Sequence, residues 1–212
     1  MTKGQFIYLV KTFFEGGDGG TGGSKRWHLG DIERYTEMGF ADTVEQLYRQ
    51  ATRYHDWMHI DPLSKVYYNI PVTKDHGELV AKLPAPVLQL PESGGVRNVW
   101  VGSPFGDPVH LTPSGAQNVY CEIQKHDGRT GDALSGYIQG ETVRIICPID
   151  RKIERVSMRL IRSLQGYKET EEMPTVFGKD GIVFQTVIQM MAGIQPGDYV
   201  NDSSSQKVAS NE

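Results

Sequence analysis

Hydrophobic residues recur with helical spacing at both ends of the chain and with strand spacing in its middle. Near the N-terminus, an apolar face predicts a helix from Lys3 to Glu15 and is formed by Phe6, Val10, Phe13 and Phe14. Thr2 and Gln5 have the spacing of a capping box at the start of this helix. A second apolar face predicts the last helix, from Asp180 to Ala192, and is formed by Phe184, Val187, Ile188 and Met191.

Two further helices are expected between the first helix and Pro62. One begins near His28. Asp42 and Glu45 indicate a fresh cap and hence a separate third helix. The apolar face of this third helix consists of Val44, Leu47, Tyr48, Ala51 and Tyr54.

From Lys65 the hydrophobic period changes to two, which is typical of strands. The predicted strands are residues 65–72, 78–83, 96–102, 118–124, 134–140 and 141–149. Residues 154–164 suit a strand or a helix, and their strand neighbours favour a strand. Turns are expected at Asp127-Gly128 and Gln139-Gly140. Prolines favour edge strands and shaped loops over a continuous central sheet, and they lie at positions 71, 84, 86, 91, 104, 108 and 113.

These patterns predict an α+β protein. A small helical bundle from the N- and C-terminal helices would carry an inserted antiparallel β domain and an extended C-terminal tail. The expected parts are an N-terminal helical part (1–63), the β domain (64–166), a loop followed by the C-terminal helix packing on the N-terminal helices (167–194), and the tail (195–212). The tail has almost nothing with which to build a core, so we expect it to hold a neighbouring protein.

The composition is that of a globular protein with a core and no basic surface. The chain has 212 residues, of which 38% are hydrophobic, and a net charge of −4. A protein of this charge is not expected to grip nucleic acid. Cys121 and Cys147 fit small buried thiols in a reducing compartment, although their pairing stays open. With neither a signal-peptide pattern nor an apolar run of ~18 residues, we expect synthesis in the cytoplasm and no membrane association.

No motif of an enzyme nucleophile or of a cofactor site is found, so neither a cofactor nor catalysis is expected. The alternative is a metal-dependent enzyme, because His55 and His59 would share one face of a helix, as zinc ligands do. Against it, His55 continues the apolar face and would edge the core. The glycine-rich residues 16–25 differ from a phosphate-binding loop and fit a flexible connection between helices.

Two surfaces are candidates for contacts with partners. The most basic stretch would meet phosphate or an acidic protein surface, or else form a solvated strand face, and it contains Arg151, Lys152, Arg155, Arg159 and Arg162. Aromatic residues such as Trp27, Trp57 and Trp100 suit interfaces as well as cores. Loops near Trp100 and Phe105 would stack on a sugar ring if the chain were an accessory binding module of a tail or capsid.

Two blocks carry a resemblance to a known family. Residues 65–102 join an extended strand, the proline segment LPAPVLQLP and a GVRNV strand, and the closing block is IQPGDYVNDSS. Together with the helical opening and its glycine-rich break, these blocks resemble small structural proteins of tailed phages that infect Bacteroidota, including crAss-like phages. Those proteins are similar in plan to podovirus adaptor proteins.

The resemblance implies a subunit of a ring in the head-to-tail connector of the virion, the adaptor below the portal. About a dozen copies would close around the DNA channel. The implied partners are other copies of the chain, the portal protein and further connector or tail ring proteins, while DNA passes without specific binding. The candidate interface residues are Pro196, Asp198, Tyr199, Val200, Asn201, Asp202, Arg155 and Arg159.

Overall fold

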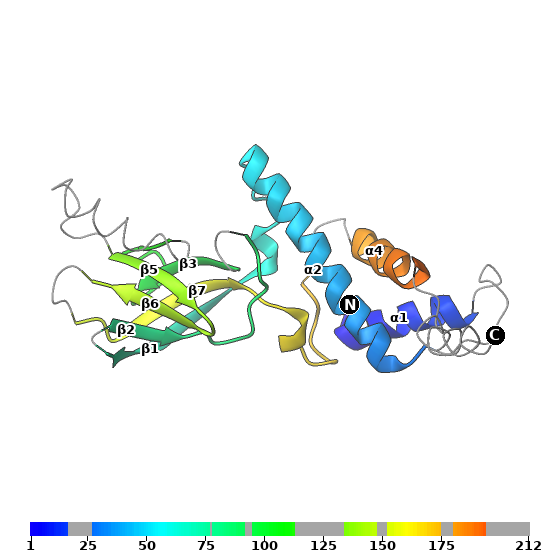
Figure 1. Ribbon diagram of the computed structural model, residues 1–212, viewed down its shortest axis with the longest axis horizontal. Coiled ribbons are helices and arrows are strands. Elements are labelled where there is room, and N and C mark those ends of the chain that lie inside the picture. The colour runs from blue at the N-terminus through cyan, green and yellow to red at the C-terminus, as the bar shows by residue number, and fades with distance from the viewer. Residues whose placement is uncertain are drawn as a thin grey trace, which may run out of the picture. The chain divides into compact units, whose positions relative to one another are not determined.

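The computed structural model describes residues 1–16, 27–76, 78–91, 95–112, 134–147, 152–174 and 180–193. Two compact units divide the chain (Figure 1): residues 1–47 together with those from 167 onward, and residues 48–166. Helices and a mostly antiparallel sheet together confirm the α+β class. The division of the chain into four segments stays a prediction.

The first helix, α1 (Lys3–Gly16), begins with the expected capping box. The Thr2 N–H donates to the Gln5 side-chain oxygen at 3.0 Å, and the Gln5 N–H donates to the Thr2 hydroxyl at 3.2 Å. These bonds satisfy amides that have no partner inside the helix. The Gly4 N–H donates to the backbone oxygen of Glu169 at 2.9 Å. A loop residue far along the chain therefore helps to hold the start of α1.

The second helix, α2 (Leu29–Tyr54), is one continuous helix, so the expected fresh start at Asp42 is wrong. The Asp42 carboxylate caps nothing and accepts a hydrogen bond from the Gln46 side chain at 2.9 Å, one turn along. Residues 41–45 contain neither glycine nor proline, so the chain has no reason to leave the helix there. The apolar face crosses this point without a break, through Ile32, Phe40, Val44 and Leu47.

The last helix, α4 (Asp180–Gly193), confirms the helix predicted for this part of the chain. The Phe184 ring meets those of Phe6 and Phe13 edge to face, with ring centres 6.1 Å and 5.7 Å apart. Val187 approaches α2 so closely that a Cβ on Gly39 would lie 2.5 Å from its Cγ2 atom. Gly39 therefore permits the contact between α2 and α4.

Gly39→Ala should lower the free energy of unfolding by about 1–3 kcal/mol, because the added methyl group would overlap Val187. Gly30→Ala is the matched control on the same helix, since no atom lies within 4 Å of its Cβ. Alanine's higher helix propensity should make that variant more stable by up to about 1 kcal/mol. Urea unfolding followed by circular dichroism measures both. Equal effects would contradict the close packing of α4 on Gly39.

The second unit holds a seven-stranded sheet with the strand order β3-β7-β1-β2-β6-β5-β4. Neighbouring strands are antiparallel except β4 and β5, which are parallel. Short 3-10 helices precede β1 (Asp61–Leu63) and follow β7 (Leu164–Gly166). The strands are β1 (Ser64–Asp75), β2 (Glu78–Lys82), β3 (Val96–Val101), β4 (Val109–Leu111), β5 (Leu134–Gln139), β6 (Thr142–Ile146) and β7 (Arg155–Ile161).

Six of these strands confirm predictions, and β4 is a strand that the sequence pattern did not indicate. For the residues of β7, the sequence pattern suited a helix as well as a strand. Its residues Val156, Met158 and Leu160 are all fully buried in one core cluster, as alternation requires. The turn at Gln139-Gly140 is also confirmed, since Gly140 has a φ of 57° between β5 and β6. The predicted strand 118–124 and the turn at Asp127-Gly128 lie outside the described residues.

The prolines fulfil only part of what they favoured: the shaped loops are confirmed for the described prolines other than Pro71, but the expectation against a continuous sheet is wrong. Pro71 lies within β1, a central strand, just after an irregularity in the pairing with β7 between Tyr67 and Ile70. The Val72 N–H donates to Glu154 on the β7 side, so the Pro71 nitrogen faces the other side of β1, where the pairing with β2 begins only at Val72. The other prolines of the described region fall between strands, at positions 84, 86, 91, 104 and 108.

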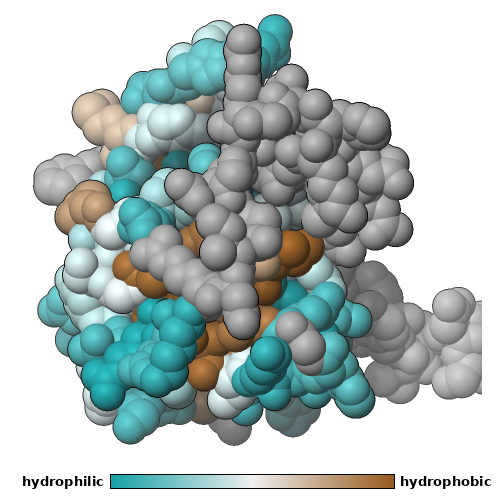
Figure 2. Space-filling view, turned by 90° about the vertical axis from the view of Figure 1, so that its left-hand side faces the viewer, coloured by the Kyte–Doolittle hydropathy of each residue, from teal (hydrophilic) through white to brown (hydrophobic). Residues whose placement is uncertain are grey.

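The sheet curls until its two edge strands, β3 and β4, meet. Trp100 forms a bridge with Pro108, and the Val101 N–H donates to the Asp107 oxygen at 2.9 Å. Figure 2 shows the face at the left of Figure 1, with apolar residues at its centre and hydrophilic residues around them. All seven strands contribute to one apolar interior, through Ile70, Ala81, Val96, Val99, Val109, Leu134, Val143, Ile145, Val156, Met158 and Leu160.

Candidate interaction groove

A groove opens in the second unit on the β3 and β4 strands. One side is formed by Val96–Val99 of β3, and the other by Pro108 and Val109–Leu111 of β4. Tyr48 and Thr52 from the end of α2, and Trp57 from the turn after it, complete the lining. The volume of about 670 Å³ is in the range of ligand-binding sites. The groove is therefore large enough for several side chains of a partner.

The charged group of the groove is Arg97, which stacks on aromatic rings. Its guanidinium carbon lies 3.9 Å from the ring centre of Trp57 and 5.7 Å from that of Tyr48. The two rings pack against each other with their centres 5.7 Å apart. Stacking uses the face of the guanidinium and leaves the N–H groups at its edge for acceptors.

The chemistry of this groove is that of an anion-binding site with an apolar wall. Arg97 forms no ion pair with any residue that the structure describes. A guanidinium binds carboxylate or phosphate through two parallel hydrogen bonds. Asn98 and His110 add polar side chains to the lining, while Trp57, Pro108 and Leu111 give it accessible apolar surface.

Sequence reasoning missed this groove. Arg97 and Asn98 belong to the block that carries the family resemblance, but Trp57 lies far from them in the chain. The only signal in the sequence is the tryptophan itself, whose aromatic ring suits a core as well as an interface. The stacking of Arg97 on Trp57 depends on tertiary structure, which no spacing rule encodes.

The histidine pair is not placed as the metal hypothesis requires. Because α2 ends at Tyr54, His55 and His59 do not share a helical face. His55 is exposed with a φ of 54°, so the expectation that it edges the core is also wrong. His59 follows in a turn, and its Nδ1 atom is buried without a hydrogen-bond partner. Within the described residues, no group of three or more His, Cys, Asp and Glu side chains is placed to hold a metal.

The arginines of the basic stretch differ in their surroundings. Arg159 is held by hydrogen bonds, since its Nε donates to the Ser64 hydroxyl at 2.6 Å and its Nη2 lies 3.5 Å from a carboxylate oxygen of Asp61. Arg162 is buried and donates to the Gly166 carbonyl, so a wholly solvated face is wrong for this stretch. Arg155 is exposed on β7. Of the two candidate interface arginines, Arg155 is the more accessible to a partner.

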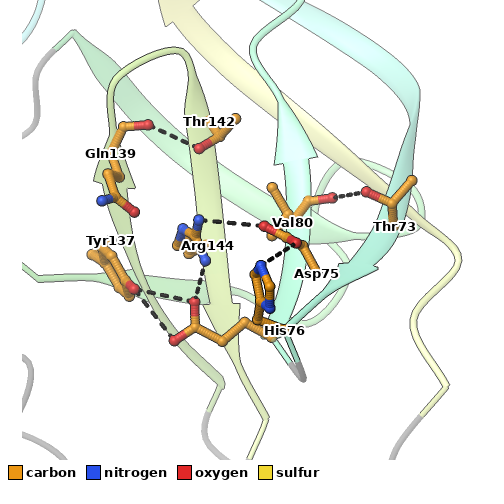
Figure 3. Close-up of polar contacts among 9 residues, drawn as sticks. Thr73, Asp75, His76, Val80, Tyr137, Gln139, Thr142 and Arg144 are labelled. Atoms are coloured by element: carbon orange, nitrogen blue, oxygen red, sulfur yellow. Dashed lines mark hydrogen bonds and ion pairs between the residues drawn. The ribbon is translucent and has the colours of Figure 1, made fainter.

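A second polar cluster lies on the sheet face opposite the core (Figure 3). Arg144 Nη1 lies 2.6 Å from a Glu78 carboxylate oxygen, and Nη2 lies 3.5 Å from Asp75. The Tyr137 hydroxyl donates to Glu78 at 3.2 Å. Burial raises the pKa of Tyr137, and the negative charge of Glu78 raises it further. The phenol thus stays protonated at neutral pH, and the cluster links β1, β2, β5 and β6.

The structure also brings Trp100 and Phe105 together, with ring centres 5.7 Å apart. Phe105 is 91% exposed and has a φ of 67°, which is unusual for a bulky residue. Whether these rings bind a sugar stays a prediction. Several other sequence candidates lie outside the described residues, namely Pro196, Asp198, Tyr199, Val200, Asn201, Asp202, Arg151, Cys121 and the glycine-rich residues 17–25.

Comparison with known proteins adds no assignment. No protein-family model matches this sequence, and no curated protein matches it. Among the described residues, no helix has both the length and the apolar character to cross a membrane.

Proposed function

We propose that the chain is a structural virion protein, one subunit of a closed ring in the head-to-tail connector of a tailed phage. The ring would lie below the portal and form part of the DNA channel. The resemblance of residues 65–102 and of IQPGDYVNDSS to such proteins supports this proposal. In the subunit that we propose, the terminal helices form a small bundle and the β unit is inserted in it. The tail reaches a neighbouring subunit.

The observation that carries the proposal is apolar surface on α1. Tyr8 and Leu9 are 70% and 46% exposed, while Phe6 and Val10 on another face of the same helix are buried. Large exposed apolar side chains on one helix are typical of surfaces that bind another protein. A ring subunit needs two different contact patches that close in a circle. The exposed face of α1 fits one of them.

Charge supports the same role. A net charge of −4 allows DNA to slide through a channel, because few phosphate contacts would hold it. The expected partners are a second copy on each side, the portal protein and the next ring of the connector or tail. No cofactor and no catalytic step belongs to this proposal.

Quantitative mass spectrometry of purified particles tests the proposal, with this chain counted against the major capsid protein. About a dozen copies per particle are expected, which is the number that the resemblance implies and is consistent with a closed ring. Hundreds of copies would indicate a capsid or sheath component instead, and absence from particles would overturn the proposal.

Charge on the exposed face of α1 should block assembly without unfolding the chain. A variant carrying Tyr8→Glu and Leu9→Glu should keep its helical circular dichroism but lose incorporation into particles by about tenfold or more, because carboxylates would be buried in the contact. Gln50→Glu is the control, since Gln50 is exposed on a different helix, α2. Normal incorporation of the double variant would exclude this face as the contact.

A further inference from the structure

The groove at Arg97 lies over the seam where β3 and β4 meet. The seam itself is closed, since Trp100 forms a bridge with Pro108 and the Val101 N–H donates to the oxygen of Asp107, just before β4. A peptide would therefore bind to the side chains that line the groove and would not insert between the two strands.

The side chains of the groove are suited to bind an acidic peptide with some apolar character. Its cation is Arg97, stacked on Trp57 and paired with no carboxylate of the described residues. Its accessible apolar surface comes from Trp57, Pro108 and Leu111, which are partly or fully exposed. A peptide that places a carboxylate at Arg97 and a branched or aromatic side chain beside it would satisfy both features.

The chain itself contains a segment with this chemistry. Residues 195–212 hold three acids, Asp198, Asp202 and Glu212, against one lysine, Lys207. In an extended strand, Asp198, Val200 and Asp202 would share one face, and Tyr199 would lie on the other. The apolar pair Tyr199-Val200 is thus flanked by two carboxylates.

We propose that the C-terminal segment of a neighbouring copy, residues 195–212, docks in the groove over β3 and β4, with Asp198 or Asp202 bound to Arg97. The use of a neighbouring copy rests on the proposed ring. The docking itself is a property of the groove and of the segment. Each subunit would offer a groove on one side and a segment on the other, which is the head-to-tail arrangement that a closed ring needs.

The experiment measures binding of a synthetic peptide of residues 195–212 to a chain truncated after residue 194. Fluorescence anisotropy of the labelled peptide gives the affinity. We expect saturable binding that is weakened about tenfold or more by Arg97→Ala, because charge-assisted hydrogen bonds are lost. Arg34→Ala, which removes an exposed arginine of α2 outside the groove lining, is the matched control and should leave the affinity unchanged.

Changes in the peptide keep the test valid if Arg97→Ala fails to fold. A peptide with Asp198→Asn and Asp202→Asn should bind the unaltered truncated chain about tenfold more weakly. The proposal would be overturned if the peptide showed no binding at about 1 mM. It would also be overturned if a scrambled peptide, or the peptide with both aspartates changed to asparagine, bound as tightly as the unaltered peptide. This result is separate from the copy number in particles, so failure of the docking and failure of the connector role are distinguishable.

Discussion

Gly95→Ala should be the most damaging glycine-to-alanine substitution among the described glycines of the β unit and should lower the free energy of unfolding by about 3 kcal/mol or more. Gly95 has a φ of 82°, which alanine adopts only with strain. A Cβ at this position would also meet the Leu88 carbonyl oxygen and the Val87 side chain. Since the Gly95 oxygen accepts the Ile161 N–H at 2.9 Å, the residue cannot shift without disturbing β7.

Gly140→Ala separates the effect of backbone strain from the effect of steric overlap. Gly140 also has a positive φ, of 57°, but no atom lies within 4 Å of its Cβ. It should therefore cost only the backbone strain, about 1–2 kcal/mol. Urea unfolding followed by tryptophan fluorescence measures both variants, because Trp57 and Trp100 belong to this unit. A loss for Gly95→Ala no greater than for Gly140→Ala would contradict the contact with Leu88.

The packing of the proline segment explains why position 95 requires glycine. Residues 83–91 read as a shaped loop in the sequence, yet the Leu88 N–H donates to the Ile161 oxygen, and Leu88 and Leu90 are buried. The segment thus pairs with the end of β7, as the Val87–Arg162 bridge also shows. The proline and hydrophobic content of this segment predicted a shaped loop. A local sequence pattern cannot predict which strand such a loop packs against.

Local signals predicted local structure well. The capping box at Thr2 and Gln5, and the alternation of Val156, Met158 and Leu160, each depend on residues close in sequence. The same kind of reasoning failed at Asp42, because a residue type that favours caps is also tolerated inside a long helix whose apolar face continues. It failed for the histidine pair because the chain leaves the helix one residue before His55, where a left-handed φ ends α2.

Local sequence signals could not predict the candidate groove, because the residues that line it are distant in sequence. Trp57 follows a helix, Arg97 lies in β3, and His110 lies in β4. Only the curling of the sheet, closed at Trp100 and Pro108, brings them to one place. Strand order and closure depend on non-local pairing, which hydrophobic period alone does not specify.

Lys3→Met should lower the free energy of unfolding by about 2–3 kcal/mol, the largest effect expected among the polar residues of the helical unit. The Lys3 side chain is 4% exposed, and its Nζ lies 2.7 Å from Glu33 and 3.0 Å from Glu37 of α2. Methionine fills the same space but leaves two carboxylates facing each other without their cation. The estimate is below the usual cost of breaking a buried pair, because the Glu33 side chain is 42% exposed and stays partly solvated.

Lys11→Met is the matched control on the same helix. Lys11 lies 3.9 Å from Glu15, and both side chains are more than one third exposed. A surface pair of this kind contributes at most about 0.5 kcal/mol. Urea unfolding at neutral pH compares the two variants. If Lys3→Met costs no more than Lys11→Met, the buried ion pair does not stabilise the unit.

The pH dependence gives a second, independent check on Lys3. Burial lowers the pKa of its ammonium, but the hydrogen bonds and charges of Glu33 and Glu37 outweigh burial and raise it above the ordinary value of 10.5. A raised pKa in the folded state means that the contribution of Lys3 is fully present below pH 10.5 and declines as the pH rises through the folded value. The stability difference between the unaltered chain and Lys3→Met should therefore be constant from neutral pH to about pH 10 and shrink above it. A difference that stayed constant into strong alkali would mean that Lys3 acts through packing, because methionine and lysine differ in charge only while the ammonium keeps its proton.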